Sequence, residues 1–335
     1  MSGSPSKRGG GRPGGPRPHV PTVSRKSDVV APHEYRPGTE RPAGASPPLD
    51  PLAVRRQLQE GGLSARHSMS QNFLADPDVL QSIIDLAAPG PGRRILEIGP
   101  GLGILTGGLL DGGAVVTAVE LDDRLADRLA YFYAGAIEAR ALTLVRGDIL
   151  DQDVASLIVS PFEVVANIPY HITSPILHRL LGMPRRPERM VLMIQREVAE
   201  RISAAPGEMS YLSAFVQYHA AVRIALAVPR NAFEPAPDVD SAVVEIRPFD
   251  PLGERPRLSP ADEDDLWRLV QAGFRERRKK LRNVLGRQLP FLGAALGDAL
   301  AGAAIDGDRR PQTLSVDEWL ALRAALGPLP GRSRQ

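Results

Sequence analysis

The 335-residue chain contains no cysteine, and this absence excludes several kinds of site at once. Without thiols the protein can form neither a disulfide framework nor a thiolate-held zinc or iron–sulfur site. The absence is consistent with a reducing compartment. The six histidines show no metal-ligand spacing, and no Ser-His-Asp order stands out. We therefore expect no metal site, and chemistry that needs neither a metal nor a covalent intermediate.

Long apolar stretches are also missing. No run approaches the length of a membrane span, and residues 1–48 lack the apolar core of a signal peptide. We therefore expect a cytoplasmic protein that does not enter membranes. Hydrophobic residues make up 43% of the chain, which supports a real core, and the length suits one large domain plus a smaller one. The net charge of +2 hides an uneven distribution of charge.

Residues 1–50 are rich in glycine, proline, serine and arginine. Such a segment cannot bury enough apolar surface to offset the entropy lost on ordering, so we predict a disordered basic tail. Its basic residues outnumber its acidic ones. Weak contact with nucleic acid is one interpretation, and a solubilising tail without a specific role is the other.

Residues 51–250 alternate between strand-like and helix-like patterns, which predicts an α/β domain with a doubly wound, Rossmann-like sheet. Two late strands flank a proline-rich loop and indicate an antiparallel edge on that sheet. Residues 251–335 are helical and more basic, which predicts a small helical domain. The expected strands cover residues 94–98, 114–119, 142–146, 162–166, 190–194, 222–228 and 241–246.

A glycine-rich turn, Gly99 to Gly103, follows the first expected strand. A dinucleotide-binding fingerprint would need its third glycine one position later, where the chain has Ile104. The spacing therefore favours a cofactor without a pyrophosphate, such as S-adenosylmethionine. Its amino-acid part would meet the glycine turn, its ribose would meet Glu120 after the second strand, and its adenine would meet Asp148 after the third.

Asn167-Ile168-Pro169-Tyr170 follows the fourth expected strand and so lies at the same edge of the sheet. The Asn167 amide and the Ile168 carbonyl can hold the hydrogens of an exocyclic amine, and a tyrosine ring can stack on a nucleobase. A plain strand-to-loop turn is the alternative, because Asn and Pro are common turn residues. The neighbouring donor site favours a clamp for an adenine amine, with Phe233 as the candidate for the opposite face of the base.

A run of basic residues lies between 274 and 287, with only Glu276 as a nearby acid. A solvated helix face is one interpretation. Charges of one sign placed so closely repel each other and require anions, which phosphates supply. We therefore predict a basic RNA-binding helix. Its expected contacts are Arg275, Arg277, Arg278, Lys279, Lys280 and Arg282.

The chain resembles the rRNA adenine N6-dimethyltransferases in five segments: residues 71–74, 97–103, 167–170, 233–243 and 274–283. The resemblance extends over nearly all of the chain except the N-terminal tail. It implies a class I methyltransferase sheet followed by a small helical domain, with S-adenosylmethionine as the methyl donor. The cofactor contacts that it implies are Asn72, Leu74, Gly99, Gly101, Glu120, Asp148 and Asn167.

That family has two relevant branches. One dimethylates two adjacent adenines in the 3′-terminal hairpin loop of 16S rRNA and serves ribosome maturation, whereas the other dimethylates a 23S rRNA adenine and gives macrolide resistance. Residues 274–283 and 310–315 are similar to the first branch. The resemblance therefore implies an enzyme for 16S rRNA in the small subunit or its precursor, and we expect a monomer. The alternatives are a 23S rRNA methyltransferase and a non-catalytic RNA-binding assembly factor.

The chain also departs from the usual pattern of that family in two places. The family often has basic residues and a glycine just before the first similar segment, where this chain has Arg66-His67-Ser68-Met69-Ser70, and residues 206–211 differ from the usual loop. Both departures concern the RNA contacts more than the chemistry.

Overall fold

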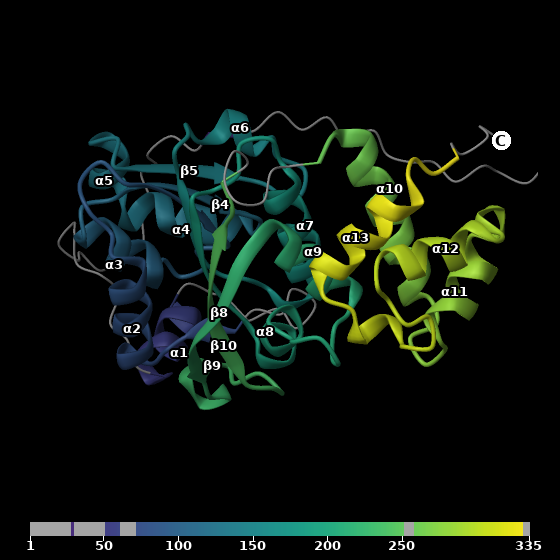
Figure 1. Ribbon diagram of the computed structural model, residues 1–335. Helices are drawn as coiled ribbons and strands as arrows, with labels where there is room; N and C mark the ends of the chain where they lie inside the picture. The colour runs from purple at the N-terminus through teal and green to yellow at the C-terminus, as the bar shows by residue number, and fades with distance from the viewer. Residues whose placement is uncertain (1–27, 30–50, 61–71, 251–257, 331–335) are drawn as a thin grey trace, which may run out of the picture.

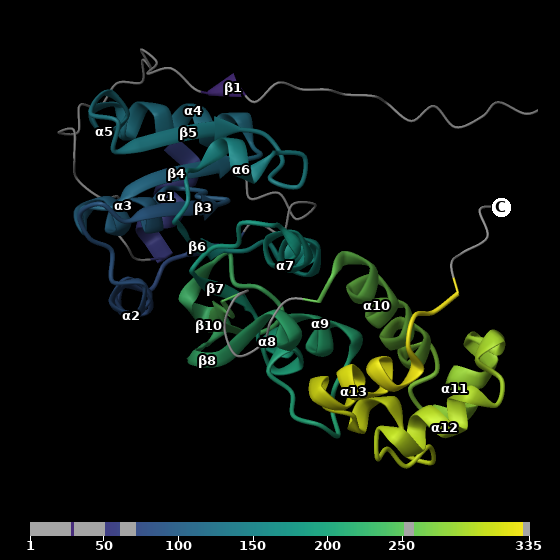
Figure 2. The same ribbon diagram turned by 45° about the horizontal axis from the view of Figure 1, so that its top comes forward.

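The computed structural model describes residues 28–29, 51–60, 72–250 and 258–330. The main sheet (Figure 1) is mixed and has the strand order β1-β5-β4-β3-β6-β7-β10-β8, whose strands are labelled in Figure 2. The strands from β5 to β7 in this order are parallel, whereas β10 is antiparallel to both of its neighbours. The predicted α/β sheet and its antiparallel edge are confirmed. The strands are β1 Asp28–Val29, β3 Arg94–Ile98, β4 Val115–Glu120, β5 Leu142–Arg146, β6 Glu163–Asn167, β7 Arg189–Gln195, β8 Ala220–Val228 and β10 Ser241–Pro248.

Helices connect these strands, and local sequence explains where they begin. At α2 the Asp76 side chain accepts hydrogen bonds from the N–H groups of Asp78 and Val79, and Pro77 occupies the first helical position. No helix in the described part of the chain is long and apolar enough to cross a membrane. The helices here are α1 Pro51–Glu60, α2 Pro77–Ala87, α3 Ile104–Asp111, α4 Asp123–Phe132, α5 Ala134–Glu138, α6 Val154–Leu157, α7 Thr173–Gly182, α8 Arg196–Ile202 and α9 Tyr211–His219.

Side chains of the central strands alternate between two hydrophobic cores. Ile95 of β3 packs in the core shared with α2, α3 and α4, whereas Leu96 packs in the core shared with α7, α8 and α9. Because helices cover both faces, the parallel strands are apolar on both sides. β3 lies between β4 and β6, so the strand order reverses there. Sheets of this kind bind ligands at the carboxyl edge beside such a reversal.

The C-terminal helices gather at one end of the molecule, coloured green to yellow in Figure 2. Trp319 is buried in their core, and Gly273 makes room for it, since a Cβ there would lie 2.5 Å from the indole ring. Helix α9 joins this core to the sheet, because Phe215 packs under the sheet and Tyr218 packs against the C-terminal helices. These helices are α10 Pro260–Phe274, α11 Leu281–Gln288, α12 Ala295–Gly302 and α13 Val316–Leu326.

Two predictions differ from the structure. Most of the predicted disordered tail, residues 1–27 and 30–50, lies outside the described residues. Asp28–Val29, however, form β1 and pair with the edge strand β5, so the prediction is wrong for these two residues. The predicted basic helix is also wrong for residues 275–280, which form a turn between α10 and α11, whereas Arg282 lies in helix α11. Like charges at helical spacing destabilise a helix, which favours the turn.

Helix α9 is absent from the sequence prediction. Most of its side chains are buried, and they surround the helix rather than forming one apolar stripe. The periodicity that marks a surface helix is therefore missing. Its start is nevertheless well defined, because Ser210 and Ser213 cap each other: each hydroxyl accepts a hydrogen bond from the other residue's backbone N–H, at 3.1 and 2.9 Å.

Candidate active site

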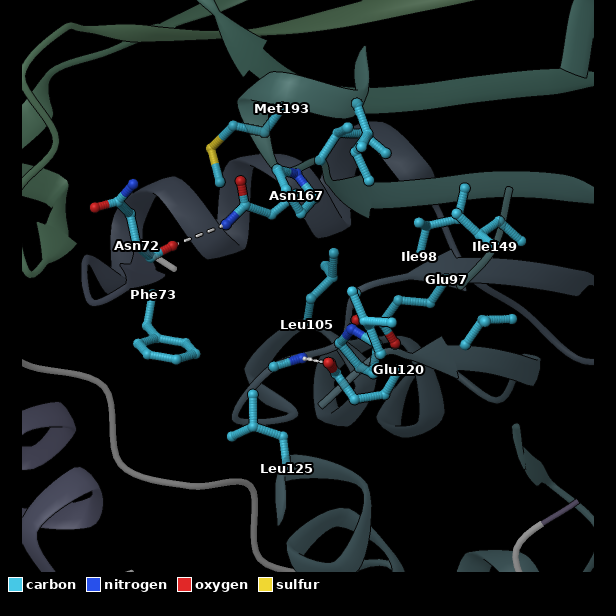
Figure 3. Close-up of a pocket in the computed structure, with 18 of the residues that line it drawn as sticks. Asn72, Phe73, Glu97, Ile98, Leu105, Glu120, Leu125, Ile149, Asn167 and Met193 are labelled. Atoms are coloured by element: carbon cyan, nitrogen blue, oxygen red, sulfur yellow. Dashed lines mark hydrogen bonds between the residues drawn. The ribbon is translucent and has the colours of Figure 1, made fainter. Parts of the chain in front are cut away.

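A pocket opens at the carboxyl edge of the sheet, beside the reversal between β3 and β6 (Figure 3). Residues that follow β3, β4, β5 and β6 form its wall, together with a short strand, β2 Phe73–Leu74. The structure brings all residues that were predicted to bind the cofactor to this one pocket. They are Asn72, Leu74, Gly99, Gly101, Glu120, Asp148 and Asn167.

The glycine turn after β3 depends on backbone conformations that favour glycine. Gly99 has φ +66° and Gly101 has φ +60°, both in the left-handed region. The N–H of Gly101 donates a hydrogen bond to Oε2 of Glu120 at 3.0 Å (Figure 3). A Cβ on Gly101 would lie only 3.2 Å from the ring of Phe73. The turn can therefore lie this close to β2 and β4 only without a side chain.

Two buried carboxyl groups line the pocket. Glu120 is 5% exposed, and its Oε1 accepts a hydrogen bond from the N–H of Asp122 at 2.9 Å. Glu97 is 1% exposed and accepts from the Thr106 hydroxyl at 2.7 Å. Burial raises the pKa of Glu120 and raises that of Glu97 to about 8. A positively charged ligand beside them would lower both pKa values and favour the ionised carboxylates, so the pocket suits a cationic ligand.

Asp148 lines the pocket at the end of β5, on the side next to Glu120. Its Oδ1 accepts a hydrogen bond from the N–H of Leu150 at 2.8 Å, which fixes the carboxylate in the turn. A carboxylate oxygen can accept a hydrogen bond from an exocyclic amine. Asp148 can therefore accept from the adenine amine of a cofactor, as the sequence predicted.

Asn167 ends β6 and is held by a residue far from it in the sequence. Its side-chain Nδ2 donates a hydrogen bond to the backbone carbonyl of Asn72 at 3.3 Å (Figure 3). The amide oxygen Oδ1 is then left as the acceptor. The N–H of Ile168 donates to the carbonyl of Met193 at 3.0 Å, and the Ile168 side chain is buried. The peptide that follows Asn167 is thus fixed between β6 and β7.

Pro169 and Tyr170 also line the pocket. Tyr170 begins a short 3₁₀ turn, Tyr170–Ile172, and its ring is partly buried. The phenol OH lies 2.8 Å from Oγ of Ser241, the first residue of β10. Burial raises the pKa of Tyr170, so the phenol stays protonated at neutral pH.

Phe233 does not line the pocket. Its ring is 2% exposed and lies in the core shared with α2, α3 and α4, and its strand, β9 Phe233–Glu234, pairs with β2. Phe233 pairs with Leu74 in the register. The role that the sequence assigned to this ring, covering the opposite face of the target base, stays a prediction. Neither Glu97 nor Ser241 was singled out from the sequence, although a carboxylate inside an apolar strand was a visible signal for Glu97.

The basic turn after α10, residues 275–280, is exposed but partly neutralised. Asp308 forms ion pairs with Lys280 and Arg282, each at 2.6 Å, and the Lys280 contact holds the pKa of Asp308 below its usual value. Arg277 donates to the carbonyl of Met209 at 3.3 Å. Arg275 donates to Oε1 of Gln288 at 2.9 Å. Among the described residues no hydrogen-bond or ion-pair partner is seen for the side chains of Arg278 and Lys279, so these two are the most available cations of the six that were predicted to bind RNA.

Comparison with known proteins shows which family this chain is similar to. The chain matches the model of a family described as "Ribosomal RNA adenine dimethylase" over residues 62–322. It is 42% identical over 276 residues to ribosomal RNA small subunit methyltransferase A of Geobacter sulfurreducens, with 80% of this chain and 98% of that protein covered. The protein of the same name from Moorella thermoacetica is 40% identical over 281 residues, with 80% and 95% covered.

Solved structures show the same fold. The 23S rRNA methyltransferase ErmE matches with a TM-score of 0.60 and 28% identity, over 76% of this chain and 99% of that one. A dimethyladenosine transferase from Plasmodium falciparum also matches with a TM-score of 0.60, at 25% identity, over 75% and 95% of the two chains. Both similarities extend well beyond the sheet of the methyl-transfer fold.

Proposed function

The chain belongs to the ribosomal RNA adenine dimethylase family, and from this premise we propose that it dimethylates N6 of two adjacent adenines in the 3′-terminal hairpin loop of 16S rRNA. The methyl donor would be S-adenosylmethionine, and the reaction would belong to the biogenesis of the small ribosomal subunit. The observation that carries this proposal is the pocket itself, where Glu120 and Asp148 lie beside Asn167 and Tyr170. A donor site and an amine clamp at one sheet edge are what transfer to an adenine amine requires.

The choice between the two rRNA subunits rests on degrees of similarity. The curated relatives named for the small subunit are 42% and 40% identical to this chain, whereas ErmE, named for 23S rRNA, is 28% identical. We therefore favour 16S rRNA, and the 23S rRNA methyltransferase is the alternative. A non-catalytic assembly factor is disfavoured, because all the predicted donor contacts line one pocket together with Ile168 and Tyr170.

The pocket residues fit S-adenosylmethionine. Gly99 and Gly101 present backbone without side chains to the pocket, and a cationic group beside the buried Glu97 and Glu120 would favour their charged forms. Asp148 would accept from the adenine amine of the cofactor. When bound, the cofactor supplies an electrophilic methyl group. The chain itself supplies shape and charge around it.

Asn167 and Ile168 would position the target amine. The nitrogen lone pair of adenine N6 is delocalised into the ring, so the amine is a weak nucleophile. Oδ1 of Asn167 and the carbonyl of Ile168 would accept its two hydrogens, which localises the lone pair and directs it towards the methyl group. Such fixed acceptors act by orientation and preorganised electrostatics, without a strong general base. Tyr170 would stack on the extruded base.

Several further features belong to this proposal. We place the RNA on the basic turn and on the surface between it and the pocket, and we treat residues 51–250 and 251–335 as the catalytic and RNA-binding domains. One chain supplies all the pocket residues named here, so a monomer would suffice. An rRNA substrate would place the protein in the cytoplasm.

Mass spectrometry of rRNA tests the proposal directly. RNA from cells with and without this protein is digested, and dimethyladenosine is mapped in 16S and 23S rRNA. We expect the two adjacent 16S adenines to be dimethylated only when the protein is present. Modification confined to 23S rRNA would establish the alternative, and unmodified rRNA together with RNA binding would favour an assembly factor.

A further inference from the structure

Residues 233–243 carry one of the family resemblances, yet none of them lines the pocket. Near its end this segment nevertheless contacts the proposed amine clamp, residues 167–170, because Oγ of Ser241 lies 2.8 Å from the phenol OH of Tyr170. We propose that Ser241 is a positioning residue whose hydroxyl holds the Tyr170 ring in the orientation that stacks on the target adenine. The inference rests on the proposed function, since that function supplies the adenine.

The backbone of Ser241 is held on both sides. It is the first residue of β10, and it pairs with Gln195 of β7 and with Val228 of β8. Its side chain is fully buried. A strand residue with neighbours on both sides cannot turn its side chain to the other face without loss of the register. Ser241 therefore offers its hydroxyl from a fixed point.

The preceding residue strengthens this anchor. The carboxylate of Asp240 accepts hydrogen bonds from Nη1 of Arg196 at 3.0 Å and from the N–H of Arg230 at 3.1 Å. The Asp240 carbonyl accepts from the N–H of Arg196 at 3.0 Å. The start of α8 and the turn after β8 are thus tied to Asp240. The chain entering Ser241 is fixed at the same sheet edge as the pocket.

Tyr170 needs such support more than its neighbours do. Asn167 and Ile168 are fixed by hydrogen bonds to Asn72 and Met193. Tyr170 begins a short 3₁₀ turn, and its ring is only partly buried, so packing alone does not select one rotamer. The contact with Ser241 links positions 71 residues apart in the sequence. Within the described part of the chain, this is the hydrogen bond that the Tyr170 side chain makes.

Two substitutions remove this hydrogen bond from opposite sides while they keep the aromatic ring. Ser241→Ala removes one hydroxyl and Tyr170→Phe removes the other. We expect each variant to lower kcat/KM for RNA about five- to tenfold, because one hydrogen bond is lost. The double variant should show no further loss. The Kd for S-adenosylmethionine, measured by calorimetry, should stay unchanged.

A matched control is Ser203→Ala. The Ser203 hydroxyl also donates a hydrogen bond, to the carbonyl of Ala199 at 2.8 Å, but it lies at the end of α8 and does not line the pocket. This variant should have wild-type kinetics. If Ser241→Ala does not fold, Tyr170→Phe still tests the contact, because it leaves the buried strand intact.

Fluorescence separates ring positioning from a merely structural role. An RNA with 2-aminopurine at the target position reports stacking through its lifetime in the complex. We expect a short lifetime with the wild type and a longer one with both single variants. Wild-type lifetimes in Ser241→Ala, or losses that add in the double variant, would overturn the proposal.

Methyl transfer by the wild type is measured first. Its absence contradicts the proposed function and, with it, the role assigned to Ser241. Transfer by the wild type together with unaffected variants contradicts the role of Ser241 alone.

Discussion

The side-chain nitrogen of Asn167 donates a hydrogen bond to the backbone carbonyl of Asn72 across 95 residues of sequence. Asn72 directly precedes β2, and β2 is held in place by pairing with β9. The contact decides which way the amide faces, because an engaged nitrogen leaves the oxygen as the acceptor. The segment that borders the cofactor pocket thereby also orients the group that would hold the target amine.

Asn167→Ala should reduce methyl transfer by about a hundredfold or more, since the loss of one preorganised polar group at a reacting centre has effects of that size. Single-turnover rates with 16S rRNA measure the change. Thermal unfolding and RNA binding serve as controls and should stay near the wild type. Near-normal turnover in a folded variant would remove Asn167 from the mechanism.

Gly101→Ala should weaken the binding of S-adenosylmethionine at least about tenfold, because the new Cβ would meet the Phe73 ring at 3.2 Å and disturb the donor of the Glu120 hydrogen bond. Gly92→Ala is the matched control: Gly92 has φ +81° with open space around its Cβ position. Both variants should lose roughly 1–2 kcal/mol of stability from backbone strain. Only Gly101→Ala should change the Kd in calorimetry, and equal effects on the Kd would argue against the close approach.

The cations of the basic turn should differ in their importance for RNA binding. Arg278→Ala and Lys279→Ala should each weaken binding and reduce the slope of log K against log salt by about one, as expected when a phosphate contact is lost. Lys280→Ala and Arg282→Ala should have smaller effects, because both side chains pair with the single carboxylate of Asp308, which offsets part of their charge. Arg94→Ala is the control, because Arg94 is exposed at the opposite edge of the sheet, and it should leave RNA binding unchanged. Equal salt slopes for all five variants would exclude the turn as the RNA-binding surface.

Glu97 should make the protein less stable as the pH rises. Its pKa is about 8 in the folded protein and about 4.5 in the unfolded chain. Between these pH values the unfolded chain loses a proton that the folded protein keeps. The contribution of Glu97 to the free energy of unfolding is therefore fully present below pH 4.5 and is lost by pH 8. One pKa unit corresponds to about 1.4 kcal/mol, so the loss amounts to several kcal/mol.

Glu97→Gln cannot ionise and should flatten this dependence. Urea unfolding at pH 5 and pH 8 measures it, and Glu138→Gln at an exposed position should behave like the wild type. A Glu97→Gln variant that keeps the full pH dependence would show that another group is responsible.

The main features of the site could be predicted because a parallel sheet aligns its strand ends. The glycine turn, Glu120, Asp148 and Asn167 each follow a strand that is recognisable from its apolar residues. Once the strands are parallel, their carboxyl ends must share one edge. Helix α9 escaped prediction for the opposite reason, because a helix buried on all sides has no polar face to mark it.

Contacts between distant residues could not be predicted from local pattern. The pairing of the Phe233 strand with β2, and the burial of the Phe233 ring in the core, could not be read from the local sequence. Asp308 lies 28 residues beyond Lys280, so its effect on the basic turn was invisible in the local charge count.

The sequence by itself therefore determined the order of chemical groups along the sheet edge, because strand pattern and connection order dictate that order. Only the tertiary structure decided how the side chains of those groups are oriented. The Asn72 carbonyl orients the Asn167 amide, and the Ser241 hydroxyl meets Tyr170. Both partners come from segments that are brought to the edge by pairing with other strands. Such contacts depend on the packing of the whole chain, because each joins residues that share no local sequence pattern.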